Sequence, residues 1–288
     1  MTREPARAVT PLIMGVVNAS IDSLTGGVDA ARAKELARSM VGSGASILDC
    51  GGQSLRTDRR ELTVQEELTT LLPVVEAVAA ACPDTTISVD TYRAEVAEAA
   101  LDAGASIVND PSGLLDPAMA ELVAERRVQL VVAYSRATPK VRMTRDRLVA
   151  NPMADAIAFL RDRLGRLDEA GVRRDQLVLD PGPDLGKSPE QSIQVLRGAP
   201  RLRAALGVQR VLWPVSRKDF VGALTGRLPH ERGAGTLGAL AAVDLQDRDL
   251  IRVHDVAGTV DFLTVRAALR DGLDGPLEMD DAIRYDPR

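Results

Sequence analysis

The chain has 288 residues, of which 45% are hydrophobic and 27% charged, an ordinary balance for a globular protein and a normal length for a single α/β barrel. Its net charge of −5 argues against a nucleic-acid partner, which demands a basic face, but does not exclude a small anionic ligand. Two cysteines and two histidines predict neither a disulfide framework nor a zinc site, and no apolar run is long enough for a signal peptide or a membrane span, so a cytoplasmic protein is expected.

Short apolar runs recur along the chain, and each is nearly continuous rather than alternating. Strands that are buried on both faces read in this way, and such strands occur in parallel sheets. The expected strands cover residues 12–18, 46–52, 86–91, 106–110, 129–135, 176–182, 208–216 and 249–256.

Alanine-rich amphipathic segments separate these runs and predict helices. The expected helices cover residues 29–43, 63–81, 93–103, 116–127, 152–171, 189–206, 231–243 and 257–271. Eight strand–helix units favour a (β/α)8 TIM barrel in a single domain, residues 1–288, with an irregular tail over 277–288. An open doubly wound sheet is the rival, but the segment after the first run lacks that fold's glycine fingerprint.

Polar residues close nearly all of the apolar runs. In a barrel of this kind the carboxyl ends of the strands surround one mouth, where active sites lie. A single polar residue in such a place is usually a helix cap, but the whole series indicates a ligand site. The residues at these ends are Asn18, Asp49, Asp90, Asn109, Asp110, Tyr134, Ser135, Asp180, Ser216, Arg217, Lys218, Arg252, His254 and Asp255, with Arg56 in the loop after the second run.

Two chemistries divide this set. Arg56, Lys218, Arg252 and His254, with Asn18, suit phosphate oxygens. The carboxylate and amide groups of Asp90, Asn109 and Asp180 suit the N–H edge of a flat heterocycle. The mouth is therefore expected to bind an aromatic nitrogen heterocycle that carries a phosphate or pyrophosphate.

The motifs along the chain resemble those of dihydropteroate synthases, which are pterin-binding (β/α)8 barrels. The resemblance runs from residue 12 to about residue 268. The matching segments are IMGVVN (13–18), GGQS (51–54), SVDTYRAEVAEAALDAGASIVNDPSG (88–113), LDPG with GKS (179–188), SRKDFVG (216–222) and RVHDV (252–256).

The resemblance implies a transferase of folate biosynthesis that condenses 6-hydroxymethyl-7,8-dihydropterin pyrophosphate with p-aminobenzoate. Asp90, Asn109 and Asp180 would bind the pterin, and Lys218 would contact its ring near the second substrate. It further implies Mg²⁺, a homodimer and no covalent enzyme nucleophile. Arg252 and His254, with Ser216, would bind the pyrophosphate, Asn18 would assist through Mg²⁺, and Arg56 would lie on the mobile second loop, with Lys218, Arg252, His254 and Arg56 as the catalytic set.

The chain departs from the family pattern in several loops. Ser20-Ile21-Asp22-Ser23-Leu24 replaces the usual Thr-Pro-Asp-Ser-Phe, and Gln53-Ser54-Leu55-Arg56-Thr57 replaces Glu-Ser-Thr-Arg-Pro. Ala133-Tyr134 stands for Met-His, and Asp184-Leu185-Gly186-Lys187 stands for Gly-Phe-Gly-Lys. Most of these changes fall on the side where p-aminobenzoate is expected. Lys187 itself reads as a solvated loop charge, and Trp213 as a packing residue.

Four alternatives follow from the same residues. A divergent or catalytically impaired paralogue would bind a pterin but use another acceptor, and a non-catalytic protein would bind it without turnover. A pterin-dependent methyltransferase would leave Arg252 and His254 unexplained, and a Schiff-base aldolase would use Lys218 as its nucleophile.

Overall fold

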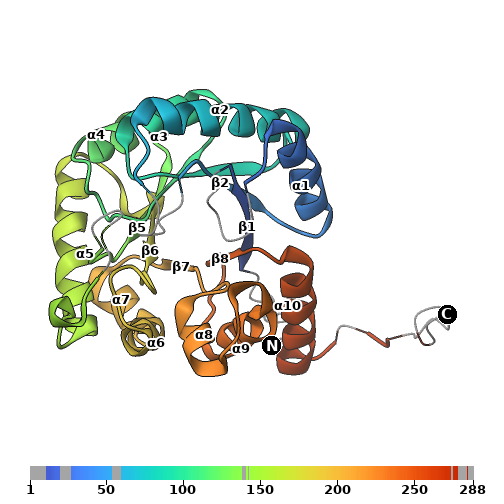
Figure 1. Cartoon of the computed structure of the whole chain (residues 1–288). Coiled ribbons are helices and arrows are strands. Elements are labelled where there is room, and N and C mark those ends of the chain that lie inside the picture. Colours follow the sequence, from blue (N-terminus) through green and yellow to red (C-terminus); the bar gives the residue numbers. More distant parts are fainter. Residues whose placement is uncertain are drawn as a thin grey trace, which may run out of the picture.

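The computed structural model describes residues 11–19, 27–53, 60–137, 141, 143–273, 275–277 and 284. Eight parallel strands close into one barrel in sequence order, which confirms the predicted fold class (Figure 1). The strands are Leu12–Asn18 (β1), Ile47–Gly51 (β2), Thr86–Asp90 (β3), Ile107–Asp110 (β4), Gln129–Ala133 (β5), Leu177–Asp180 (β6), Arg210–Trp213 (β7) and Leu250–Val253 (β8).

Helices form a layer around the barrel (Figure 1). They are Ala30–Gly42 (α1), Val64–Ala81 (α2), Ala94–Asp102 (α3), Ala118–Arg126 (α4), Pro152–Glu169 (α5), Pro189–Arg197 (α6), Ala199–Leu206 (α7), Asp219–Thr225 (α8), Gly233–Ala242 (α9) and Val256–Asp271 (α10), with 3₁₀ turns at Arg145–Arg147, Arg174–Gln176 and Pro229–Glu231.

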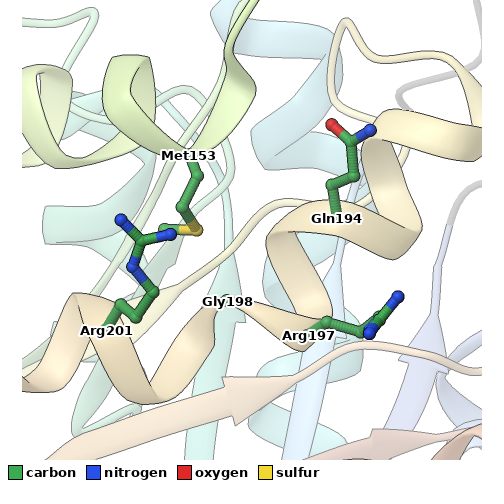
Figure 2. A pocket seen from close by; sticks show the side chains of 5 residues that line it. All are labelled: Met153, Gln194, Arg197, Gly198 and Arg201. Atoms are coloured by element: carbon green, nitrogen blue, oxygen red, sulfur yellow. The ribbon is translucent and has the colours of Figure 1, made fainter.

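Two features of this layer were not predicted. The segment expected as one helix over 189–206 is broken at Gly198, between α6 and α7, and the short α8 follows Lys218 directly. A Cβ on Gly198 would lie 2.0 Å from the Met153 sulfur, so the glycine lets α5 approach the break, as Figure 2 shows. Pro200, which lacks an N–H, starts the next helix within its first turn.

The barrel closes through parallel pairing of β1 with β8, in which Leu12 faces Leu250 and Met14 faces Arg252. Residues two apart on a strand point to the same side of the sheet. Alternate positions on the strands therefore point into the barrel, and their carboxyl-terminal members gather at one mouth.

Two apolar clusters fill the structure. The larger lies between strands and helices and consists mainly of Ala, Val and Leu. The smaller cluster fills the barrel interior with Met14, Ile47, Ile107, Val131, Val178, Leu212 and Leu250, one residue from each of seven strands. This inner layer fills the barrel below the mouth. The mouth is therefore a pocket with a closed floor and does not open into a channel.

Within the described residues, no helix combines the length and apolar character required to cross a membrane.

Candidate active site

A polar layer lies directly above the inner apolar layer. Asp49, Asn109, Asp180 and Arg252 each follow a member of the inner cluster by two residues on the same strand. They therefore point into the barrel, one step nearer its mouth. The three acidic and amide members are almost fully buried, with exposed fractions of 0%, 4% and 5%. Charged groups at such depth require partners.

Arg252 holds this layer together by bridging two carboxylates. Its Nε donates to Asp49 Oδ2 (2.6 Å) and its Nη2 donates to Asp90 Oδ2 (2.7 Å). Burial alone would lower the pKa of Arg252, but the two carboxylates together raise it. Burial raises the pKa of Asp90, and Arg252 opposes that shift. A ligand that donates N–H groups to Asp90 would compete with the guanidinium for this carboxylate.

Asp180 ends β6 and shapes the turn that follows it. Its Oδ1 accepts the N–H of Gly182 (2.6 Å), and Gly182 has a φ of +62°. A Cβ on Gly182 would lie 2.0 Å from the Tyr134 carbonyl oxygen, so no other residue fits this turn without movement. Burial raises the pKa of Asp180, while Gly182 and nearby cations lower it. The turn leaves Oδ2 of the carboxylate for a ligand.

Ser216 and His254 form a hydrogen-bonded pair that joins the ends of β7 and β8. The Ser216 hydroxyl lies 2.9 Å from His254 Nδ1 and accepts the backbone N–H of His254 (3.3 Å). Burial, followed by Arg252, Arg217 and Lys218, lowers the pKa of His254 to about 3. The imidazole is thus neutral and carries one N–H. In the tautomer in which the Ser216 hydroxyl donates to Nδ1, that N–H is Nε2–H.

Lys218 is presented by a strained turn. Arg217, just before it, has a φ of +59°, a region that residues other than glycine rarely occupy. The Arg232 guanidinium fixes this turn by donating to the carbonyls of Arg217 (2.9 Å) and Lys218 (3.1 Å). A Cβ on Gly222 would lie 2.2 Å from Arg232 Nη2, which explains the glycine in SRKDFVG.

Lys187 connects the ends of β5 and β6, so its assignment as a solvated loop charge was wrong. Its Nζ donates to the carbonyls of Tyr134 (2.7 Å) and Leu185 (2.9 Å) and lies 3.8 Å from the centroid of the Tyr134 ring. Burial lowers the pKa of Lys187 to about 7, against the opposing effect of Asp180. This half-buried amine therefore contacts two backbone carbonyls and a ring face.

Tyr134 is anchored on its other side by α5. Its hydroxyl donates to Asp155 Oδ2 (2.6 Å), which also accepts from Arg136 Nε (2.6 Å). Phe159 packs edge-on against the Tyr134 ring at 5.6 Å between centroids. The residue that replaces the usual histidine is thus part of a packed cluster and does not point freely into the mouth.

Gln53 and Tyr92 connect the second loop to the end of β3. Gln53 accepts the backbone N–H of Leu62 (2.6 Å) and donates to the Tyr92 hydroxyl (2.9 Å), which donates to Glu61 (2.6 Å). These contacts bring the residues that flank segment 54–59 together. Arg56 itself lies outside the described residues, as do residues 20–24 of the first loop.

The remaining residues singled out in the sequence have structural roles in turns, helix caps or packing. Asp110 accepts the N–H groups of Ser112 and Leu114, both at 2.8 Å, and Asp255 caps α10, so both fix local turns. Trp213 is fully buried and donates to Asp249 (2.9 Å), which confirms it as a packing residue. The structure thus brings together at the mouth Asp90, Asn109, Asp180, Ser216, Lys218, Arg252 and His254, with Asn18 at the end of β1.

Three supporting residues were not predicted from the sequence. Asp49 was noted only as a strand end, although its spacing of two residues from Ile47 could have shown that it points inward. The role of Lys187 depends on loop packing, which no local pattern reveals. Arg232 donates to the carbonyl of Lys218, which lies 14 residues earlier in the chain, so no local pattern reveals this contact.

A surface hollow of about 350 Å³ lies away from this mouth, among α5, α6 and α7 (Figure 2). Met153, Gln194, Arg197, Gly198 and Arg201 line it. None of the predicted site residues belongs to it, so it plays no part in the site described above. In the described part of the chain, no group of three or more His, Cys, Asp or Glu residues could hold a metal ion.

Comparisons with known proteins agree with this geometry. The family model described as pterin binding enzyme matches residues 14–254. A solved Xanthomonas albilineans dihydropteroate synthase with 4-aminobenzoic acid is 37% identical with a TM-score of 0.79, covering 90% of this chain and 93% of that chain. A Yersinia pestis dihydropteroate synthase with a sulfonamide drug is 31% identical with a TM-score of 0.84, covering 93% and 97%.

Curated relatives fall into two groups by length. The Escherichia coli dihydropteroate synthase type-3 is 34% identical over 266 residues, which are 89% of this chain and 98% of that protein. A Haloferax volcanii protein, named probable bifunctional folylpolyglutamate synthase/dihydropteroate synthase, is 37% identical over 90% of this chain. The match spans only 30% of that longer relative.

Proposed function

The chain belongs to the pterin-binding enzyme family, and from that premise we propose that it is a dihydropteroate synthase-type transferase. It condenses 6-hydroxymethyl-7,8-dihydropterin pyrophosphate with p-aminobenzoate in folate biosynthesis. The observation that carries the proposal is the buried polar layer, in which acceptors for a heterocycle lie beside donors for an anion. The family match and the closed barrel confirm the predicted family and fold.

The acceptor groups of the layer suit the pterin ring. Asp180 Oδ2 and Asp90 offer carboxylate oxygens to ring and amino N–H groups, and Asn109 adds an amide oxygen. Because these groups are buried, a ligand without matching donors would leave them unpaired. That cost selects for an aminopyrimidinone edge over a hydrocarbon ring of similar shape.

The donor groups suit the leaving pyrophosphate. Lys218, the unbound N–H groups of Arg252 and the Nε2–H of the Ser216–His254 pair are proposed to neutralise the charge that develops as the C–O bond breaks. The carbon left behind is a cationic methylene-pterin, and the arylamine nitrogen attacks it and loses a proton. No covalent bond to the protein forms, so no nucleophile–base pair is needed.

Mg²⁺ is proposed to be bound through Asn18. The amide oxygen of this residue lies at the end of β1, and it is a hard ligand of the type that Mg²⁺ accepts. Mg²⁺ usually takes few protein ligands and completes its shell with phosphate oxygens and water, so it does not require a group of three or more protein ligands, and the described residues contain no such group. When bound, the ion would add positive charge next to the pyrophosphate.

The assembly is proposed to be a homodimer in the cytoplasm. Large apolar side chains are exposed on and beside α8 and α10, namely Leu224, Leu228, Val265 and Leu269. Figure 1 shows α9 between these two helices on one side of the barrel, and a second copy would cover this side. Light scattering should give twice the chain mass, and Leu269→Glu should reduce it. The free cysteines Cys50 and Cys82 agree with a reducing compartment.

A second candidate is a pterin-binding paralogue with another acceptor. Leu185 stands where the family pattern has phenylalanine, on the side expected to face the arylamine. The packed Tyr134 cluster stands where the pattern has histidine and is joined to Leu185 through Lys187. This reading keeps the same heterocycle site and changes only the second substrate.

A condensation assay separates the two. The protein, the pterin pyrophosphate and Mg²⁺ are incubated with p-aminobenzoate or with other arylamines, and pyrophosphate and the pterin product are measured. Release of pyrophosphate with dihydropteroate supports the synthase. Product formation only with another amine supports the paralogue, and absence of any product at high protein concentration refutes both transferase readings.

A further inference from the structure

Asp49 lies beneath the predicted ligand site and connects two of its members. It is fully buried on β2, and its Oδ2 accepts both Arg252 Nε (2.6 Å) and Asn109 Nδ2 (3.2 Å). One oxygen atom thereby joins β2, β4 and β8, no two of which are adjacent in the barrel. Nothing in the pterin chemistry above requires Asp49 to touch the substrate.

A carboxylate can only accept hydrogen bonds, so its position dictates which way an amide beside it must face. Asn109 therefore turns its nitrogen toward Asp49 and its oxygen away from it, toward the mouth. Among the described residues, the Asn109 side chain hydrogen-bonds only through its nitrogen. We propose that Asp49 is a positioning residue that fixes Asn109 as an acceptor for the heterocycle and holds Arg252 beside it as a donor for the pyrophosphate, an inference that rests on the proposed pterin site.

Arg252 needs this second anchor because its first one faces the ligand. Asp90 holds the other edge of the guanidinium, at 2.7 Å, and is itself a predicted pterin acceptor. When ring N–H groups occupy Asp90, Asp49 keeps Arg252 from swinging out of the layer. One arginine between two carboxylates leaves one negative charge without a cation, and N–H groups of a ligand at Asp90 would stabilise it.

Ser88 supplies a matched control at the same depth. It is fully buried and pairs with Asp49 across β2 and β3, and its hydroxyl has no partner among the described residues. Removing that hydroxyl changes the same layer without breaking the contacts to Asn109 and Arg252.

The test measures binding by calorimetry with 6-hydroxymethyl-7,8-dihydropterin pyrophosphate and with the pterin lacking pyrophosphate. Asp49→Asn should weaken both by about 10-fold and Asp49→Ala by about 100-fold, with one site per chain retained. Ser88→Ala should stay within about twofold of the unaltered protein, and the KM for the arylamine should stay within about twofold in all three. A purely structural role would lower the folded fraction without changing the affinity of the sites that remain.

A double-mutant cycle shows whether Asp49 acts through Asn109. Asp49→Asn should weaken binding less in an Asn109→Ala background than in the unaltered chain, because part of its effect is already lost. If Asp49→Ala does not fold, Asp49→Asn decides the matter by itself. Unaltered pterin affinity in folded Asp49→Asn overturns the inference even when the condensation assay succeeds. Weakened binding supports it even when that assay gives no product, which would refute the transferase alone.

Discussion

The two sides of the barrel mouth are built on different principles. The pterin side, formed by Asp49, Asp90, Asn109, Asp180 and Arg252, consists of residues that point inward from strands and bond across the barrel. The β5–β6 side, formed by Tyr134, Arg136, Asp155, Leu185 and Lys187, consists of residues that follow strands and bond to a helix or to loop carbonyls.

The difference explains where the chain keeps its family pattern and where it departs. A residue that points inward is constrained by seven other strands, because each strand also fills the closed interior. Loop residues face fewer such constraints and can exchange partners locally. Tyr134 illustrates this, since Asp155 and Phe159 accommodate it on the outer side. Binding of the pterin should therefore depend on the first side and choice of the acceptor on the second.

The largest expected effect comes from removing the acceptor at the end of β6. Asp180→Ala should weaken pterin pyrophosphate binding by at least about 100-fold, because the ring N–H groups lose a buried carboxylate. Calorimetry measures the affinity. Asp180→Asn is the control for the turn, since its oxygen can still accept the Gly182 N–H. Unchanged affinity in Asp180→Ala would contradict the assignment of Asp180 to the pterin.

The pterin side was also the more predictable one from sequence. Asp90, Asn109 and Asp180 could be found because they end apolar runs and because the motifs around them resemble a family. Asp49 was recognised only as one of the strand ends, because its contacts to Asn109 and Arg252 depend on how distant strands meet across the barrel. The sequence could not reveal Lys187, whose two carbonyl partners come from separate loops. The break at Gly198 was missed because the helical periodicity continues on both sides of it.

Lys187 offers a way to disturb the β5–β6 side alone. Lys187→Met leaves an unbranched side chain one atom shorter and removes the Nζ group that donates to the carbonyls of Tyr134 and Leu185. The KM for p-aminobenzoate should rise by about 10-fold while the pterin Kd changes by less than about threefold. Steady-state kinetics and calorimetry on the same preparation give the two values. If the KM for p-aminobenzoate and the pterin Kd rise by the same factor, the proposed separation of the two sides is wrong.

The same lysine should make stability depend on pH. Its pKa is lowered from 10.5 to about 7 in the folded chain. Between these two pH values the unfolded chain therefore binds more protons than the folded chain. Stability must then rise with pH over that window, by up to about 1 kcal/mol per pH unit between pH 7.5 and 8.5. Urea unfolding should show this rise in the unaltered chain relative to Lys187→Met. A constant difference between the two chains would mean that Lys187 is charged in the folded state.

The smallest expected effect compares a tyrosine of the β5–β6 side with one beside the second loop. Tyr134→Phe removes the hydrogen bond to Asp155 (2.6 Å), and Tyr92→Phe removes the one to Glu61 (2.6 Å) beside the second loop. Each should lower the free energy of unfolding by about 1 kcal/mol. Neither hydroxyl belongs to the pterin side, so the pterin Kd should be unchanged in both. Arylamine kinetics should then respond to Tyr134→Phe if the packed cluster shapes the acceptor site. If the two variants have equal arylamine kinetics, the Tyr134 cluster only stabilises α5. The choice of acceptor would then depend on the loops after β1 and β2.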